Sequence, residues 1–170
     1  SVVVTSTLSC SAEAIDSLGE ELAVSYDWSL SSGLYLGSGS SLVLFDAGVR
    51  AGDEVVCTAS STDSYDLVST SEDMVVVENS LPVVVSVSVS SDEEDSSVVH
   101  TSGVLSASAS AEDADGDDVE LIYYWYVDGL LSAESSAQLD GSLHFERDQE
   151  IQVEISGSDG SGEGERLSSE

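Results

Sequence analysis

The sequence predicts an all-β protein made of two antiparallel β-sandwich units in tandem. First, residues 14–28 recur without a gap 97 positions later, as residues 111–125. Second, apolar residues alternate with polar ones in many short stretches, which is the period of a half-buried strand. Third, no stretch combines a helical apolar period with helix caps. Short strands separated by turn signals are typical of a β-sandwich.

The repeat divides the chain into two domains. It is carried by Asp16, Gly19, Tyr26 and Trp28 in the first half and by Asp113, Gly116, Tyr123 and Trp125 in the second. Between the halves lies Glu78-Asn-Ser-Leu-Pro82, a linker ending in a proline that cannot donate to a ladder and suits a strand start. We therefore expect domain 1 over residues 1–79 and domain 2 over residues 80–170.

The expected strands follow in chain order. In domain 1 they are residues 2–4, 7–14, 22–28, 41–45, 52–59 and 74–77. In domain 2 they are residues 83–89, 104–111, 119–125, 137–145 and 149–155. The inward positions of 22–28 and 119–125 predict a core that includes Tyr26, Trp28, Tyr123 and Trp125. Domain 1 has no counterpart of strand 83–89, and domain 2 has none of the last strand of domain 1.

Charge excludes several classes of partner. The chain has 34 acidic and 3 basic residues, a net charge of −31, and no lysine. Binding to nucleic acid or to an anionic membrane needs a basic surface, so neither is expected. Such self-repulsion must be screened by salt or bound cations, which favours the outside of a cell. No apolar run approaches the ~20 residues of a membrane span, and the first residues lack the features of a signal peptide.

Two cysteines, Cys10 and Cys57, lie on alternating stretches of domain 1. In an extracellular chain such a pair is more often a disulfide than two free thiols, so we expect them to be bonded. Domain 2 has Ala107 and Val153 at the corresponding positions.

The order Cys10, Trp28, Cys57 resembles that of the immunoglobulin fold. The motifs DADGD at 113–117, WYVDG at 125–129 and ENSLP at 78–82 resemble the tandem Ig-like/PKD-like repeats of large bacterial surface proteins. The resemblance implies two immunoglobulin-like sandwiches whose cysteines bridge the two sheets. Val55 stands where that fold usually has a tyrosine, so a tyrosine corner is not implied. The resemblance to these surface-protein repeats implies adhesive, spacer or fibre-forming roles.

One acidic turn is a candidate calcium site. Asp113, Asp115 and Asp117 alternate around Gly116, and a hard cation prefers such oxygen ligands. In an immunoglobulin-like sandwich the loops at the same end would bring Asp159 close, and the preceding linker would bring Glu78 and Asn79 within reach. The alternative is an ordinary acidic turn, because Asp and Gly favour turns. Calcium is the one cofactor that we expect.

No set of residues in the sequence indicates catalysis. His100 and His144 stand alone, which argues against zinc, and no Gly-x-Ser-x-Gly elbow joins a strand to a helix. Tyr124 and Tyr126 point away from the core and are candidates for contact with a partner or glycan. An enzyme is not expected.

The sequence therefore predicts an extracellular or cell-surface structural or adhesive module, rod-like and stiffened by calcium. One alternative is the subunit of an extracellular filament joined by β-strand addition, with Ser1–Val4 as the donor strand and an open edge in domain 2 as the acceptor. Another is a carbohydrate-binding accessory module. The expected partners are neighbouring repeats or copies of the chain, and a cell-surface protein or glycan.

Overall fold

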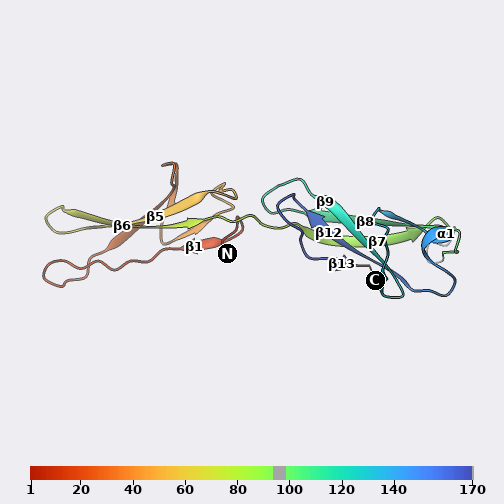
Figure 1. The fold of residues 1–170 in the computed structure, drawn as a ribbon. Helices are drawn as coiled ribbons and strands as arrows, with labels where there is room; N and C mark the ends of the chain where they lie inside the picture. Colours follow the sequence, from red (N-terminus) through yellow and green to blue (C-terminus); the bar gives the residue numbers. More distant parts are fainter. Residues whose placement is uncertain (94–98, 170) are drawn as a thin grey trace. The chain divides into compact units, whose positions relative to one another are not determined.

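The computed structural model describes residues 1–93 and 99–169, which form two compact units, Ser1–Ser80 and Leu81–Glu170 (Figure 1). We call these unit 1 and unit 2. The boundary between the units falls after Ser80, one residue later than the boundary after residue 79 that the sequence predicts. The regular secondary structure of the described residues is almost entirely β-strand in antiparallel sheets, as the alternating pattern predicted.

Unit 1 contains two sheets. A four-stranded sheet has the order β3-β2-β5-β6, and β1 pairs with β4 in a second, two-stranded sheet. All of these pairs are antiparallel. The strands are β1 (Thr7–Ser9), β2 (Val24–Leu30), β3 (Tyr35–Ser38), β4 (Ser41–Val43), β5 (Glu54–Thr62) and β6 (Val68–Val76).

The core of unit 1 lies between these sheets. It contains Trp28 and Val55 from the larger sheet and Leu42 from the smaller one. The ring nitrogen of Trp28 donates to the carbonyl of Gly39 at 2.8 Å, so the buried indole keeps a hydrogen-bond partner. Tyr26 is half-buried and packs against this cluster.

Unit 2 also contains two antiparallel sheets, β11-β8-β7 and β10-β9-β12-β13. Its core joins side chains of both sheets, including Leu105 of β8 and Trp125 of β9, which makes the unit sandwich-like. Tyr123 packs against this core and is partly buried. The elements are β7 (Val83–Ser91), β8 (Val104–Glu112), β9 (Glu120–Val127), β10 (Leu130–Leu131), β11 (Gln138–Asp140), α1 (Gly141–His144), β12 (Ile151–Ser158) and β13 (Leu167–Ser168).

Several elements differ from expectation: residues 2–4 form no strand, and β3 and β10 were not expected. The expected strand 137–145 stops at Asp140, whose carboxylate accepts from the backbone N–H of Ser142 and begins the one-turn helix α1. The expected strand 7–14 is reduced to β1, which ends at Ser9. Unit 2 does have a final strand, β13, but it consists of two residues paired with β12, whereas β6 of unit 1 runs for nine.

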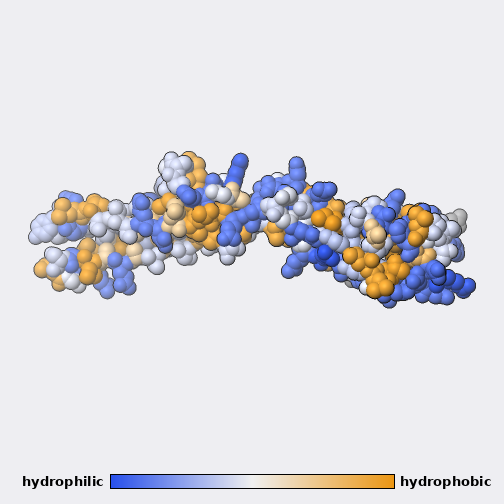
Figure 2. Space-filling view, in the orientation of Figure 1, coloured by the Kyte–Doolittle hydropathy of each residue, from blue (hydrophilic) through white to orange (hydrophobic). Residues whose placement is uncertain are grey.

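The surface mixes polar and apolar side chains. Figure 2 shows hydrophobic residues dispersed among hydrophilic ones on the visible face of each unit. Within residues 1–93 and 99–169, no helix has the length and apolar character that crossing a membrane requires.

Candidate cation site

The acidic turn joins β8 to β9. Oδ1 of Asp113 accepts the backbone N–H of Asp115 at 2.8 Å and that of Asp117 at 3.3 Å. Gly116 closes the turn, because its N–H donates to the Asp113 carbonyl and its φ of 81° is in the region that favours glycine. The first aspartate thus organises the backbone from which the other two project.

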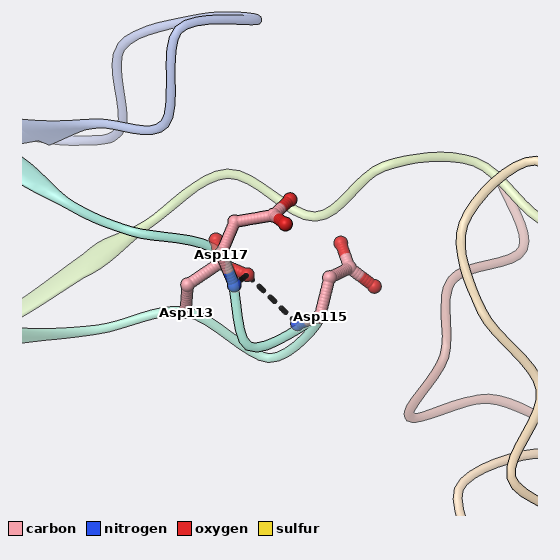
Figure 3. A group of neighbouring side chains, drawn as sticks. All are labelled: Asp113, Asp115 and Asp117. Atoms are coloured by element: carbon pink, nitrogen blue, oxygen red, sulfur yellow. Dashed lines mark hydrogen bonds between the residues drawn. The ribbon is translucent and has the colours of Figure 1, made fainter.

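The three carboxylates of this turn gather at one point (Figure 3). One oxygen each from Asp113, Asp115 and Asp117 lie within 4.8 Å of one another. Oδ2 of Asp113 is buried and has no hydrogen-bond partner in the described part of the chain. Hard cations such as Ca²⁺ bind six to eight oxygens, so this turn offers carboxylate ligands that backbone carbonyls or water would have to supplement.

The remaining predicted ligands lie outside this group. Asp159 caps its own turn, since its Oδ1 accepts from the backbone N–H groups of Ser161 and Gly162 at 2.7 and 2.9 Å. Glu78 and Asn79 belong to unit 1, where the N–H of Glu78 donates to Val2. The three-carboxylate group is thus formed by unit 2 alone.

Two turns of unit 1 show which aspartate the backbone requires. Oδ1 of Asp16 accepts the N–H groups of the second and fourth following residues, both at 2.8 Å. Oδ1 of Asp63 does the same at 2.8 and 2.9 Å. The second following residue is Leu18 in one turn and Tyr65 in the other. This type of turn therefore forms without an aspartate at the position of Asp115. The backbone hydrogen bonds explain the aspartate at position 113 but not the one at position 115.

The disulfide is the second site predicted by the sequence. Cys10 and Cys57 are bonded, and no described cysteine is free. Disulfides are typical of oxidising compartments outside the cytoplasm. In unit 2, Ala107 and Val153 are buried without a bridge.

Arg166 pairs with Glu154 and Glu163, as expected for an arginine among acids, but the sequence did not predict its contacts with two tyrosines. Its guanidinium lies 3.4 Å from the centroid of the Tyr124 ring, and its Nη1 donates to the Tyr126 hydroxyl at 3.3 Å. The Tyr124 and Tyr126 hydroxyls donate to Glu163 and Glu154 at 2.8 and 2.9 Å. The alternation of Tyr124 and Tyr126 indicated that both side chains point away from the core. Their partner, Arg166, lies in a loop 40 residues after Tyr126 and could not be identified from the sequence.

These contacts shift ionisation within this group of side chains. Burial, followed by the hydrogen bond to Glu163, raises the pKa of Tyr124 above its ordinary value. The hydrogen bond from Ser156, followed by that from Tyr124, lowers the pKa of Glu163. These pKa shifts favour neutral Tyr124 and Tyr126 and an ionised Glu163.

Another polar group near α1 has the residue types of a nucleophile, base and acid. Ser132 Oγ lies 3.3 Å from His144 Nδ1, and His144 Nε2 lies 3.6 Å from Glu134. However, the backbone N–H groups of Ser135 and Ser136 donate to the Glu134 carboxylate. The hydrogen bonds from Ser136 lower the pKa of Glu134. None of the three residues lines the groove of about 530 Å³ in unit 1 or the hollow of about 500 Å³ beside α1 in unit 2. The group therefore has the character of a local turn network.

Comparison of the chain with family models, curated proteins and solved structures finds no match.

Proposed function

We propose that this chain is a non-enzymatic extracellular structural module of two tandem immunoglobulin-like sandwiches, with Ca²⁺ held at Asp113, Asp115 and Asp117. The convergence of those three carboxylates on one turn carries the cation part of the proposal. Their like charges repel at this separation, and a bound divalent cation would convert that repulsion into attraction.

Fold, charge and the disulfide support the structural role. A net charge of −31 needs screening by salt or cations, and the Cys10–Cys57 bond needs an oxidising compartment. Both conditions are met outside a cell. The Ser132 group lines neither the groove of unit 1 nor the hollow of about 500 Å³ in unit 2, and backbone N–H groups donate to Glu134, which favours a non-enzymatic role.

The alternatives have weaker support. A carbohydrate-binding surface needs accessible aromatic faces, but Arg166 stacks on Tyr124. A filament with Ser1–Val4 as donor strand would require that segment to leave its own unit. Val4 is 3% exposed in the core of unit 1, and the Val2 carbonyl accepts from Glu78.

Calorimetry of the full chain with calcium or with a chelator tests the cation site. Extracellular calcium modules bind with a Kd of about 10⁻⁴–10⁻³ M, so 10 mM Ca²⁺ should stabilise unit 2 by roughly 1.4–2.7 kcal/mol. For a domain of this size that corresponds to a rise in Tm of roughly 5–20 °C. The Tm of unit 1 should change far less.

Matched variants separate specific binding from charge screening. Asp117→Asn removes a carboxylate of the group, whereas Asp118→Asn removes the neighbouring charge outside it. We expect the first variant to lose most of the calcium-dependent rise and the second to keep it. Equal responses of the two variants, or an unchanged midpoint of the parent protein at 10 mM Ca²⁺, would contradict the cation site.

A further inference from the structure

Unit 1 has an open sheet edge where unit 2 has a strand. In unit 2, β8 lies in the middle of its sheet, with β11 on one side and β7 along the other. In unit 1, β1 takes the place of β8 and pairs with β4. Among residues 1–93 and 99–169, no strand pairs with the other edge of β1.

A groove of about 530 Å³ lies in unit 1 beside the segment that follows β1. One wall is the segment that follows β1 together with the start of β2, and the other is the hairpin of β5 and β6. In Figure 2, hydrophobic side chains lie on both of the loops at the left end of unit 1, with a hollow between them. Its apolar lining residues include Ala12, Ala14, Ile15, Leu22 and Leu67.

Unit 2 shows what fills the corresponding space. Pro82, at the start of β7, is fully buried and lies against Gly157, where an added Cβ would be 2.9 Å from the proline Cβ. The same added atom would lie 2.8 Å from Val119 and 3.7 Å from Ala111, so these residues surround one spot. The corresponding residues of unit 1, all of which line the groove, are Ser61, Leu22 and Ala14.

The groove also contains groups that lack partners. Ser61 is 7% exposed, and its hydroxyl has no hydrogen-bond partner among the described residues. A buried hydroxyl without a partner costs free energy, which an incoming backbone could recover. Ile15 and Leu67, on opposite walls, are 70% and 69% exposed. Both observations indicate a surface that is completed by another segment.

We infer that unit 1 binds an extended β-strand of the Leu81–Ser91 type, added antiparallel to residues 7–15. In unit 2 the ladder sets Val84 opposite Ala111 and Val87 opposite Ala109. Equivalent valines of the bound strand would lie opposite Ala14 and Ala12. Recognition would thus use backbone hydrogen bonds for affinity and alternating small apolar side chains for register.

Charge and strand pairing limit which segments could occupy the groove. Glu13, Asp16 and Asp63 line the groove, so an acidic strand would be repelled, whereas Leu81–Ser91 carries no charge. β7 is itself paired along β8 in unit 2. The occupant that we infer is therefore a strand of this chemistry supplied by a partner protein.

The test uses the full chain and a fluorescent peptide with the sequence of Leu81–Ser91. We expect saturable one-to-one binding by anisotropy, a higher Tm for unit 1, and slower amide exchange in residues 8–15. The control peptide replaces the valines corresponding to Val84 and Val87 by serine and should bind at least tenfold more weakly. Neither peptide adds charge, so the difference reports side-chain fit.

Variants of the chain locate the binding. Ala14→Glu places a charge in the groove and should weaken binding at least tenfold, whereas Ser25→Glu adds the same charge on a strand residue outside it. Leu67→Glu, at an exposed position on the other wall, gives the same test if Ala14→Glu fails to fold. Absence of binding, or equal binding by the Ala14 and Ser25 variants, would overturn the inference. So would concentration-dependent dimers that exclude the peptide, because the occupant would then be a second copy.

Discussion

Trp28 lies directly opposite Cys57 in the ladder between β2 and β5. Trp125 lies opposite Val153 in the ladder between β9 and β12, so the two units place an indole beside the same strand position. In unit 1 that position is bonded to Cys10. In unit 2 a buried valine takes the place of that cysteine, and no disulfide joins the two sheets.

Reduction should therefore destabilise unit 1 selectively. The bond joins residues separated by 47 positions, for which loop entropy gives about 4 kcal/mol. Calorimetry of the full chain with dithiothreitol should lower the unit 1 transition and leave that of unit 2 in place. A Cys10→Ala/Cys57→Ala variant should not respond to the reductant. A parallel fall of both transitions would show that unit 2 depends on unit 1 for its stability.

Unit 2 should accept the bridge that it lacks. In Ala107→Cys/Val153→Cys, the new cysteines take the positions that correspond to Cys10 and Cys57. If the units are equivalent at the backbone level, the bond should form on oxidation and stabilise unit 2 by roughly 2–4 kcal/mol. Thiol titration and calorimetry measure the two effects. Free thiols after oxidation would show that the two strands are not placed as in unit 1.

Glu163 should make unit 2 sensitive to acid. Its folded-state pKa is lowered, so its contribution to stability is present above the ordinary pKa of 4.5 and is lost as the pH falls below that value. Glu163→Gln should therefore be less stable than the parent at pH 7, and the gap should narrow as the pH falls below about 4.5. Calorimetry of the unit 2 transition at constant ionic strength measures the gap. Glu165→Gln, which removes a charge two positions away, is the matched control, and an identical narrowing in both variants would contradict the assignment to Glu163.

The Ser132, His144 and Glu134 group should be inactive as a hydrolase. Activated esters and peptides should be cleaved at the same background rate by the parent and by Ser132→Ala, because the group is engaged in local turns. A burst of product release that the alanine variant abolishes would reveal a nucleophile. It would also overturn the non-enzymatic function.

Patterns that depend on neighbours in sequence were predictable. The alternation through Tyr26 and Trp28 located β2, and the same pattern through Tyr123 and Trp125 located β9. The acidic turn was also predictable, because its hydrogen bonds run from Asp113 to residues two and four positions later.

Features that depend on partners far along the chain were not predictable. Residues 7–14 alternate as well as β8 does, yet β1 is short because a strand persists only where another strand pairs with it. Alternation is a property of the segment, whereas pairing is a property of the fold. The stacking of Arg166 on Tyr124 likewise joins a loop to a sheet face, and nothing local to either residue indicates it.

The positions of the arginines also determine where a trypsin-like protease can cleave the chain. An enzyme that cuts after lysine or arginine finds no lysine here and three arginines. Arg166 is held by Tyr124 and Glu163, whereas the Arg147 side chain, in the loop before β12, is 88% exposed. A single cut after Arg147 would separate β7–β11 from β12 and β13 in sequence. The two pieces would remain joined by the ladder between β9 and β12. The same composition that gives a net charge of −31 thus leaves a trypsin-like protease only three possible cleavage sites in the sequence.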